Sequence, residues 1–210
     1  MDILTTLSDS VQNGNHDSIK EQVSTALDQG IEPVVILKSG LIAGMDRIGE
    51  KFKNGDIFIP NVLIAARAMS SAMDILKPKL VETGARPAGK FIIGTVLGDH
   101  HDIGKNLVKM MLQGKGFEVE DLGINVPPEK FVQAISDDTD IVGMSALLST
   151  TRPLMKETIE AIDRAGLRDR VKIMIGGGAV TGEYAEQIGA DGYGADATLS
   201  AELALKLIAR

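Results

Sequence analysis

The sequence contains no cysteine and no tryptophan, and aromatic residues make up only 3% of its 210 residues. Without cysteine, a disulfide framework and a thiolate metal site are both excluded. No apolar run approaches the roughly 20 residues that cross a bilayer. The first ten residues, MDILTTLSDS, lack the basic start and apolar run of a signal peptide. We therefore expect no membrane segment, a cytoplasmic location and a core built from aliphatic side chains.

Positive charge is also scarce, with 22 Lys and Arg residues against 29 Asp and Glu residues and a net charge of -7. Nucleic-acid binding needs a basic stripe, and the Lys and Arg residues do not cluster in that way, so we expect no nucleic-acid partner. Hydrophobic residues account for 44% of the chain, enough for the core of one large or two small domains. The 23 glycines, combined with few aromatics, favour an α/β protein.

Residues 1–84 have apolar side chains at helical spacing throughout. Gly30 and Asn54-Gly55 break the pattern, and Pro33 and Pro60 stand where new helices can begin. The pattern predicts a bundle of about four helices. The apolar stripes are Ile3, Leu7 and Val11; Ile19, Val23 and Leu27; Leu37, Leu41, Met45, Ile48 and Phe52; and Val62, Ala66, Met69, Met73 and Leu76.

The pattern changes after a linker at residues 85–90, and residues 91–210 alternate short apolar runs with helical stretches. This alternation predicts a parallel sheet covered by helices on both faces, a Rossmann-like or flavodoxin-like fold. The expected strands are FIIGTV (91–96), FEVEDLG (117–123), DIVGMS (140–145) and VKIMIG (171–176). The expected helices cover residues 103–115, 127–136, 152–165, 182–189 and 196–209.

The segment GDHHDIGKNLV, residues 98–108, holds two of the three histidines of the chain, side by side between two aspartates. It directly follows a predicted strand, and ligands of open parallel sheets bind at the carboxyl ends of the strands. In one interpretation an aspartate caps the next helix and both histidines are solvated. In a second, both histidines and an aspartate bind zinc, although adjacent side chains diverge and no HExxH motif follows.

In a third interpretation a single histidine is an axial metal ligand, and an acid two residues earlier orients its ring. A carboxylate that accepts the N–H of a ligating imidazole fixes its tautomer and raises its basicity. Asp99 and His101 have this spacing, and Gly104 lets the backbone pass close to a large group. This interpretation leaves His100 as a solvated neighbour.

Small residues follow two further strands, Ser145 after DIVGM and Gly176-Gly177-Gly178 after VKIMI. A glycine run after a strand is explained by a tight turn and does not match the GxGxxG dinucleotide motif. Its position matters more, because the carboxyl ends of these strands meet at one edge of the sheet. Small residues there predict a slot that admits a flat or elongated group.

Asp99-x-His101-x-x-Gly104, Ser145-x-Leu147 and Gly176-Gly177 together resemble the three-part signature of the cobalamin-binding domain that takes its corrinoid base-off and histidine-on. Residues 45–69, MDRIGEKFKNGDIFIPNVLIAARAM, resemble the helical cap of methyl-transferring members. The resemblance extends over residues 10–205. The chain is similar to the small corrinoid proteins of methyltransferase systems that serve methanol, methylamines, glycine betaine or aryl methyl ethers.

The resemblance implies a role for each matching residue. His101 would be the lower axial ligand of cobalt, Asp99 would hydrogen-bond its far ring nitrogen, and Thr151 stands where the family has a relay serine. The slot for the displaced nucleotide tail would be lined by Ser145, Leu147, Gly176 and Gly177. Gly178-Ala179 stands where the family often has Ala-Pro. An apolar lid over the upper face of the corrin would use Phe58, Val62 and Leu63, and would exclude water.

These expectations predict a corrinoid carrier that accepts a methyl group on Co(I) from a donor-specific methyltransferase. It would pass the group to tetrahydrofolate or a thiol carrier through a second methyltransferase, and a reductive activator protein would be a further partner. The cofactor supplies the bond chemistry and the protein sets ligation and access. Three alternatives stay open: a cobalamin-dependent sensor or regulator, a hydrolase with a divalent metal at the DHHD segment, and the small subunit of an isomerase.

Overall fold

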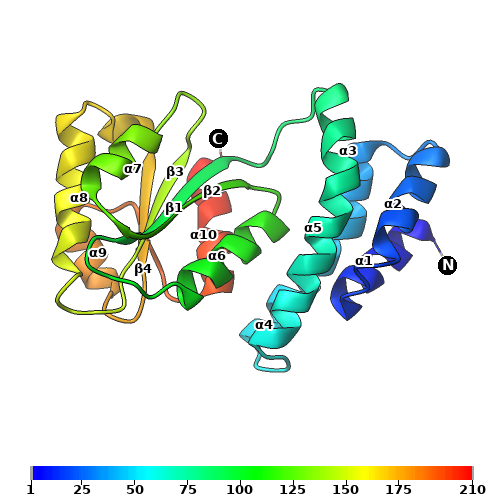
Figure 1. Ribbon diagram of the computed structural model, residues 1–210, viewed down its shortest axis with the longest axis horizontal. Helices are drawn as coiled ribbons and strands as arrows, with labels where there is room; N and C mark the ends of the chain where they lie inside the picture. The colour runs from blue at the N-terminus through cyan, green and yellow to red at the C-terminus, as the bar shows by residue number, and fades with distance from the viewer. Residues whose placement is uncertain (1, 210) are drawn as a thin grey trace. The chain divides into compact units, whose positions relative to one another are not determined.

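The computed structural model describes residues 2–209 and divides into two compact units. One is helical and extends to Pro87, with residues 114–116; the other is an α/β unit that begins at Ala88. Figure 1 shows the elements of both units, which are described separately below. The predicted fold, a helical region followed by a Rossmann-like parallel-sheet domain, is confirmed.

The helical unit forms around α5, which packs against α1, α2 and α4. Its core is aliphatic, as the sequence predicts, and the largest buried side chains include Leu7, Ile19, Ile36, Leu41 and Leu76. The elements are α1 (Ile3–Asn13), α2 (Ile19–Asp28), α3 (Pro33–Val35), the π-helical η1 (Ile36–Ile42), α4 (Ala43–Lys53) and α5 (Ile59–Glu82).

The helix predicted to begin at Pro33 does so, but its second segment, η1, is π-helical and the periodicity did not reveal this. Such wider turns shift the face that a helix presents. Gly44, just after η1, has no room for a side chain, because a Cβ there would meet the Ser8 carbonyl and the Val11 side chain at 2.7 and 2.8 Å. The glycine therefore allows α4 to approach α1 closely.

One helix of the described residues, α5, is long and apolar enough to cross a membrane by length and composition alone. One third of its most apolar window is buried inside the protein. The core helix of a water-soluble protein passes the same test, so this is weak evidence for a membrane segment.

The α/β unit contains a five-stranded sheet whose pairings are all parallel, in the order β2-β1-β3-β4-β5. The strands are β1 (Lys90–Val96), β2 (Glu118–Val126), β3 (Ile141–Ser145), β4 (Lys172–Gly176) and β5 (Gly192–Gly194). This order is flavodoxin-like and reverses between β1 and β3, which places a ligand crevice at their carboxyl ends. Four of the five strands match the predicted runs to within a few residues.

Helices cover both faces of this sheet: α6 and α10 on one side, α7, α8 and α9 on the other (Figure 1). Their bounds are α6 (Ile103–Gly114), α7 (Pro128–Ala134), α8 (Pro153–Arg164), α9 (Gly182–Ile188) and α10 (Ala197–Ile208), and the short 3-10 turn η2 (Arg168–Arg170) precedes β4. A large apolar cluster that includes Phe131, Met155 and Ile162 joins the sheet to α7, α8 and α9.

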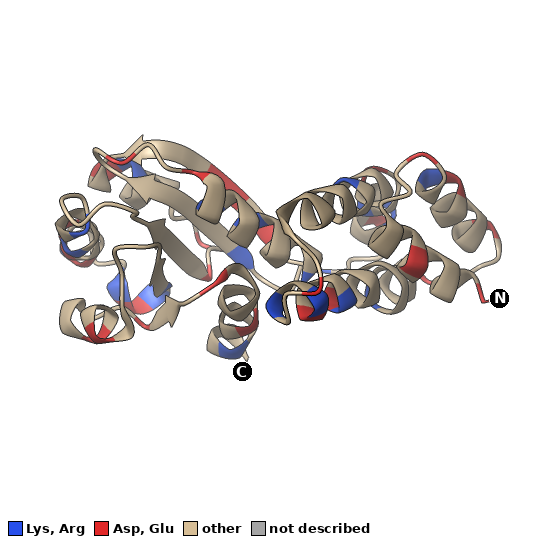
Figure 2. Ribbon diagram, turned by 90° about the horizontal axis from the view of Figure 1, so that it is seen from below, with Lys and Arg blue, Asp and Glu red and all other residues tan. Residues whose placement is uncertain are grey.

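Charged residues are dispersed over both units. In Figure 2, Lys and Arg alternate with Asp and Glu along the helices instead of gathering on one face. The acidic excess of the sequence is therefore spread over the surface.

Candidate functional site

Three loops meet at the carboxyl edge of the sheet, after β1, β3 and β4. The strand register places Thr95 beside Ser145 and Ser145 beside Gly176, so the strands end at the same level. The predicted site residues of the α/β unit lie in the loops that follow, at the last residues of β3 and β4, or in the first turn of α6. The signature elements, about 45 and 30 residues apart along the chain, are thus brought together by the parallel pairing.

Asp99 is the centre of this edge and has no exposed surface. Its Oδ1 accepts the His101 backbone N–H at 3.0 Å and lies 2.7 Å from His101 Nδ1. Its Oδ2 accepts hydrogen bonds from the backbone N–H groups of Leu147 and Leu148, at 2.8 and 3.2 Å, and from the Thr151 hydroxyl at 2.9 Å. The carboxylate therefore ties the β1 loop to the β3 loop.

Burial alone would raise the pKa of Asp99, because it penalises the charged form. Hydrogen bonds from the His101 backbone and ring, the Leu147 N–H and the Thr151 hydroxyl outweigh burial, and they hold the pKa far below its ordinary value of 3.8. Asp99 is consequently ionised at neutral pH. An ionised carboxylate can only accept, so in the neutral imidazole the proton of His101 is on Nδ1 and the lone pair is on Nε2.

The His101 side chain is half exposed, with 51% of its surface accessible, although the buried Asp99 holds its Nδ1. Its backbone carbonyl accepts a hydrogen bond from Thr95 Oγ1 at 2.9 Å. Within residues 2–209, Nε2 has no hydrogen-bond partner. The loop therefore presents an oriented nitrogen lone pair outward, which is the arrangement of an axial metal ligand with an orienting acid.

Apolar side chains surround this edge. Five large hydrophobic residues of the α/β unit are exposed, and every one lies in the loops or element ends at the carboxyl edge: Leu97, Ile103, Ile124, Leu147 and Leu148. Ile103 is the most exposed at 69%. An apolar surface concentrated around one oriented imidazole marks a ligand site, because scattered exposed apolar residues would not all fall on one edge.

Gly104 leaves open space at the site, whereas Gly176 and Gly177, at the end of β4, allow close packing of the backbone. A Cβ at Gly104 would meet no atom within 4 Å, so this position borders open space. Gly177 has a φ of 114°, and a Cβ there would collide with the backbone of Ala146, while one at Gly176 would meet the Gly194 carbonyl at 3.0 Å. The glycine pair is therefore required for close packing of the β3 and β4 ends, and Gly104 is the residue that leaves room.

The remaining predicted residues fall into two groups. Ser145 is partly buried at the end of β3, and Leu147 is 47% exposed beside it in sequence. In the helical unit Phe58 and Leu63 are exposed, at 72% and 43%. Val62 is fully buried, so as a member of the expected lid it can only support the surface that the other two form.

The other interpretations of the DHHD segment find less support. Asp99 does not cap α6, because both of its oxygens are directed to the β1 and β3 loops. Asp102, the other aspartate of that interpretation, directly precedes α6, and its Oδ2 accepts a hydrogen bond from Asn106 Nδ2 at 3.0 Å. His100 is exposed, as a solvated neighbour would be. Among residues 2–209, no three His, Cys, Asp or Glu side chains gather to hold a metal ion by themselves, which is the site that the hydrolase hypothesis needs.

Several residues that shape the loop were not singled out from the sequence. Asn125 has a φ of 53°, and it holds the β1 loop through its side chain to Gly98 N and its N–H to the Asp99 carbonyl, at 2.8 and 3.0 Å. Leu148 and Thr95 contribute through a backbone N–H and a hydroxyl. Backbone donors carry no residue-type signal, and an asparagine two residues after the glycine that ends the expected strand 117–123 is a weak turn signal.

The fold and the site define a Rossmann-like domain that presents one oriented histidine and an apolar rim at the carboxyl edge of its sheet. Two family models match the chain, both described as B12 binding domain, over residues 89–202 and residues 3–77. A corrinoid protein of Desulfitobacterium hafniense is 37% identical over 100% of this chain and 99% of its own length. Trimethylamine corrinoid protein 1 of Methanosarcina acetivorans is 39% identical over 94% of this chain and 93% of its own.

Solved structures give the same result. A cobalamin-binding protein from Desulfitobacterium hafniense has a TM-score of 0.80 and 31% identity, with 100% of both chains covered. The methanol:cobalamin methyltransferase complex from Methanosarcina barkeri contains a chain with a TM-score of 0.87 and 28% identity, covering 98% of this chain and 79% of that one. The chain belongs to the B12-binding family of corrinoid proteins.

Proposed function

We propose that this protein is the methyl-carrying corrinoid subunit of a methyltransferase system. The observation that carries the proposal is His101, whose Nδ1 is fixed by buried Asp99 while its Nε2 has no hydrogen-bond partner among residues 2–209. A trimethylamine corrinoid protein and a methanol:cobalamin methyltransferase complex among its relatives support the same function. A bound corrinoid supplies a cobalt centre that takes up a methyl group and gives it away.

The residues of the edge then have defined tasks. His101 Nε2 would ligate cobalt from below in place of the cofactor's own base, and Asp99 would keep the ring in the required tautomer. Thr151 would complete the relay, since its hydroxyl already lies 2.9 Å from Asp99 Oδ2. Gly104 would clear space for the macrocycle, and Leu147 would pack against it.

Ser145, Gly176 and Gly177 would line the slot for the displaced nucleotide tail. The tight packing of the two glycines against Ala146 and Gly194 supports a shape role for them, because it removes side chains from this part of the edge. Phe58 and Leu63 would supply the apolar lid over the upper face, with Val62 behind them, and would exclude water from the reactive centre.

A donor-specific methyltransferase would deliver the methyl group, and a second methyltransferase would pass it to tetrahydrofolate or a thiol. A reductive activator protein would restore the cobalt after oxidation, and all of these partners would meet the carrier in the cytoplasm. The relatives include a methyltransferase complex and methylamine corrinoid proteins, which supports a methyltransferase partner.

The experiment is reconstitution of the purified protein with methylcobalamin, followed by addition of each candidate methyltransferase with tetrahydrofolate or a thiol acceptor. We expect one corrinoid per chain and loss of its methyl group only when a matching enzyme is present. A protein that binds no corrinoid, or that binds it with the cofactor's own base still on cobalt, would contradict the proposal.

A further inference from the structure

A buried lysine, Lys105, stands in the first turn of α6, four residues after His101. Lys105 is the third residue of the helix, and only 2% of its side chain is exposed. A cation is disfavoured there twice, because burial removes its water and the helix N-terminus is the positive end of the dipole. Such a residue must be held by specific partners.

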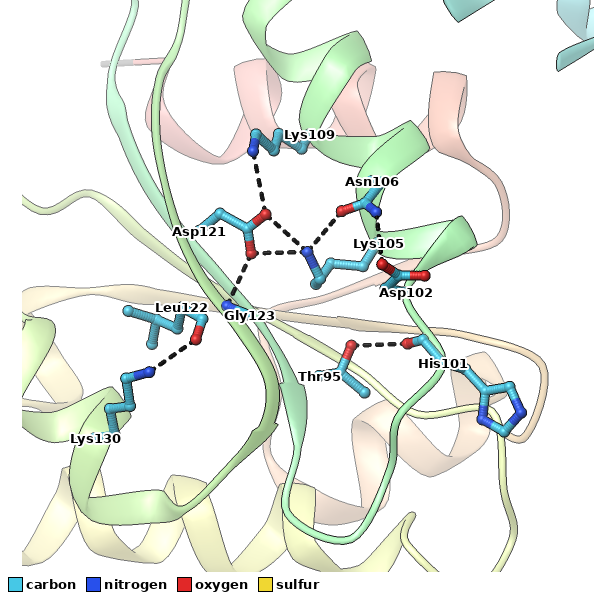
Figure 3. Close-up of polar contacts among 10 residues, drawn as sticks. All are labelled: Thr95, His101, Asp102, Lys105, Asn106, Lys109, Asp121, Leu122, Gly123 and Lys130. Carbon is cyan, nitrogen blue, oxygen red and sulfur yellow. Dashed lines mark hydrogen bonds and ion pairs between the residues drawn. The ribbon is translucent and has the colours of Figure 1, made fainter. Parts of the chain in front are cut away.

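Those partners are an acid on β2 and the neighbouring asparagine. Lys105 Nζ lies 2.7 and 2.8 Å from the two oxygens of Asp121 and 2.7 Å from Asn106 Oδ1, so its three protons are all engaged (Figure 3). Asp121 also accepts hydrogen bonds from Lys109 Nζ at 3.2 Å and from Gly123 N at 3.0 Å. Asp121 therefore holds Lys105 in place, and Lys109 and Gly123 hold Asp121.

A bulge in β2 follows Asp121 directly. The pairing of β1 with β2 shifts by one residue after Asp121, and the carbonyl of the extra residue, Leu122, accepts a hydrogen bond from Lys130 Nζ at 2.8 Å. Bulges re-aim a side chain and often lie beside functional sites. Burial raises the pKa of Asp121, but Lys105, Gly123 and Lys109 together lower it below its usual value.

The cluster formed by Lys105, Asn106, Lys109 and Asp121 is linked to the backbone next to His101. Asn106 uses its oxygen for Lys105 and donates from Nδ2 to Asp102 Oδ2 at 3.0 Å. Asp102 follows His101 directly, and the His101 carbonyl is held by Thr95. In Figure 3 the His101 ring points away from the cluster, so the cluster can act on the loop backbone without touching the ring.

We propose that Lys105, held by Asp121 of β2, is a positioning residue for His101 and acts through Asn106 and Asp102 on the loop that carries the imidazole. The inference rests on the proposed role of His101 as the cobalt ligand. Its consequence is that breaking the path should weaken ligation without removing any group that touches the corrinoid.

The test compares Asn106→Ala, which cuts the path but leaves Lys105 paired with Asp121, with Lys105→Met. The double variant Lys105→Met/Asp121→Leu replaces the ion pair with apolar side chains and covers the case in which Lys105→Met alone does not fold. Lys90→Met is the matched control, because this lysine also pairs with an aspartate, at 3.0 Å, but at the opposite end of β1.

Two properties are measured. The first is amide hydrogen exchange of His101 in the corrinoid-free protein, followed by nuclear magnetic resonance. The second is the share of bound methylcobalamin whose cobalt carries imidazole, read from the absorbance spectrum. We expect about tenfold faster exchange and an about tenfold lower ligation constant in the path variants, the lower end of losses seen for outer-shell partners. Lys90→Met should match the parent in both.

Parent-like exchange and ligation in both Asn106→Ala and a folded Lys105 variant would overturn the proposal, as would an equal effect of Lys90→Met. If the parent itself shows no imidazole on cobalt, the proposed function fails. Exchange then still decides the inference: faster His101 exchange in the path variants supports the positioning role, and unchanged exchange overturns it.

Discussion

Asp99→Asn removes the charge of a buried carboxylate that accepts five hydrogen bonds, while the size of the side chain stays the same. In the amide one oxygen becomes an NH2 group. If the amide oxygen stays with His101, the NH2 faces the backbone N–H groups of Leu147 and Leu148, and both lose their acceptor. The Thr151 hydroxyl can rotate and accept instead. At about 1–3 kcal/mol for each unpaired buried donor, we expect a loss of about 3–4 kcal/mol in the free energy of unfolding of the α/β unit.

The assay is urea unfolding followed by tyrosine fluorescence. The chain has no tryptophan, and its two tyrosines, Tyr184 and Tyr193, both belong to the α/β unit, so the signal reports that unit alone. Asp138→Asn is the control, because this aspartate is solvent-exposed and its replacement should leave the unfolding midpoint close to that of the parent. If Asp99→Asn stays within about 1 kcal/mol of the parent, the reasoning that places an ionised acceptor at the centre of both loops is wrong.

A double-mutant cycle sharpens the same prediction. Thr151→Val removes one donor to Asp99 Oδ2 and should cost about 1 kcal/mol in the parent. In the Asp99→Asn background this cost should shrink by about 0.5 kcal/mol or more, since the two side chains are in direct contact. Strictly additive losses would show that the hydroxyl and the carboxylate do not act together.

Three further predictions concern single positions. Gly177→Ala should destabilise the α/β unit by about 2–4 kcal/mol in the tyrosine assay, because of its φ of 114° and the collision with Ala146; an unchanged midpoint would refute the packing argument. Gly104→Ala should leave stability equal or up to about 1 kcal/mol higher, yet lower the affinity for methylcobalamin, and equal affinity would show that Gly104 clears no space for the macrocycle. The ionised Asp121 stabilises the fold at pH values above its ordinary pKa of 3.8, and this stabilisation is lost as the pH falls through its lower pKa in the folded protein. Below about pH 4, the free energy of unfolding should therefore fall less steeply with pH in Asp121→Asn than in the parent. An identical slope in the two proteins would contradict this.

Much of the fold follows from periodicity. The strands that lead to the site have uninterrupted apolar runs because they are buried on both faces, and the site loops follow them directly. β5, Gly192–Gly194, escaped prediction because a three-residue strand with two glycines has no apolar pattern. The π-helical turn at Ile36–Ile42 also escaped, since the apolar residues there fit an ordinary helix equally well.

The site, like the fold, was predicted only in part from the sequence. The spacing of Asp99 and His101 identified an acid–imidazole pair, and the structure places them 2.7 Å apart. The Thr151 contact depended on loop geometry that spacing does not determine. Lys105 was passed over, because a lysine in the first turn of a helix usually lies in solvent, and its pairing with Asp121 of β2 could not be read from the sequence.

Electron paramagnetic resonance of the Co(II) form of the reconstituted protein tests the central claim most directly, because an axial nitrogen splits the cobalt lines. We predict nitrogen splitting in the parent that changes when only the histidines carry nitrogen-15. This isotope effect should vanish in His101→Ala, where any remaining splitting comes from the cofactor's own base, and it should remain in His100→Ala. A histidine isotope effect that persists in His101→Ala, or that disappears in His100→Ala, would contradict the assignment of His101 as the ligand that this fold presents to cobalt.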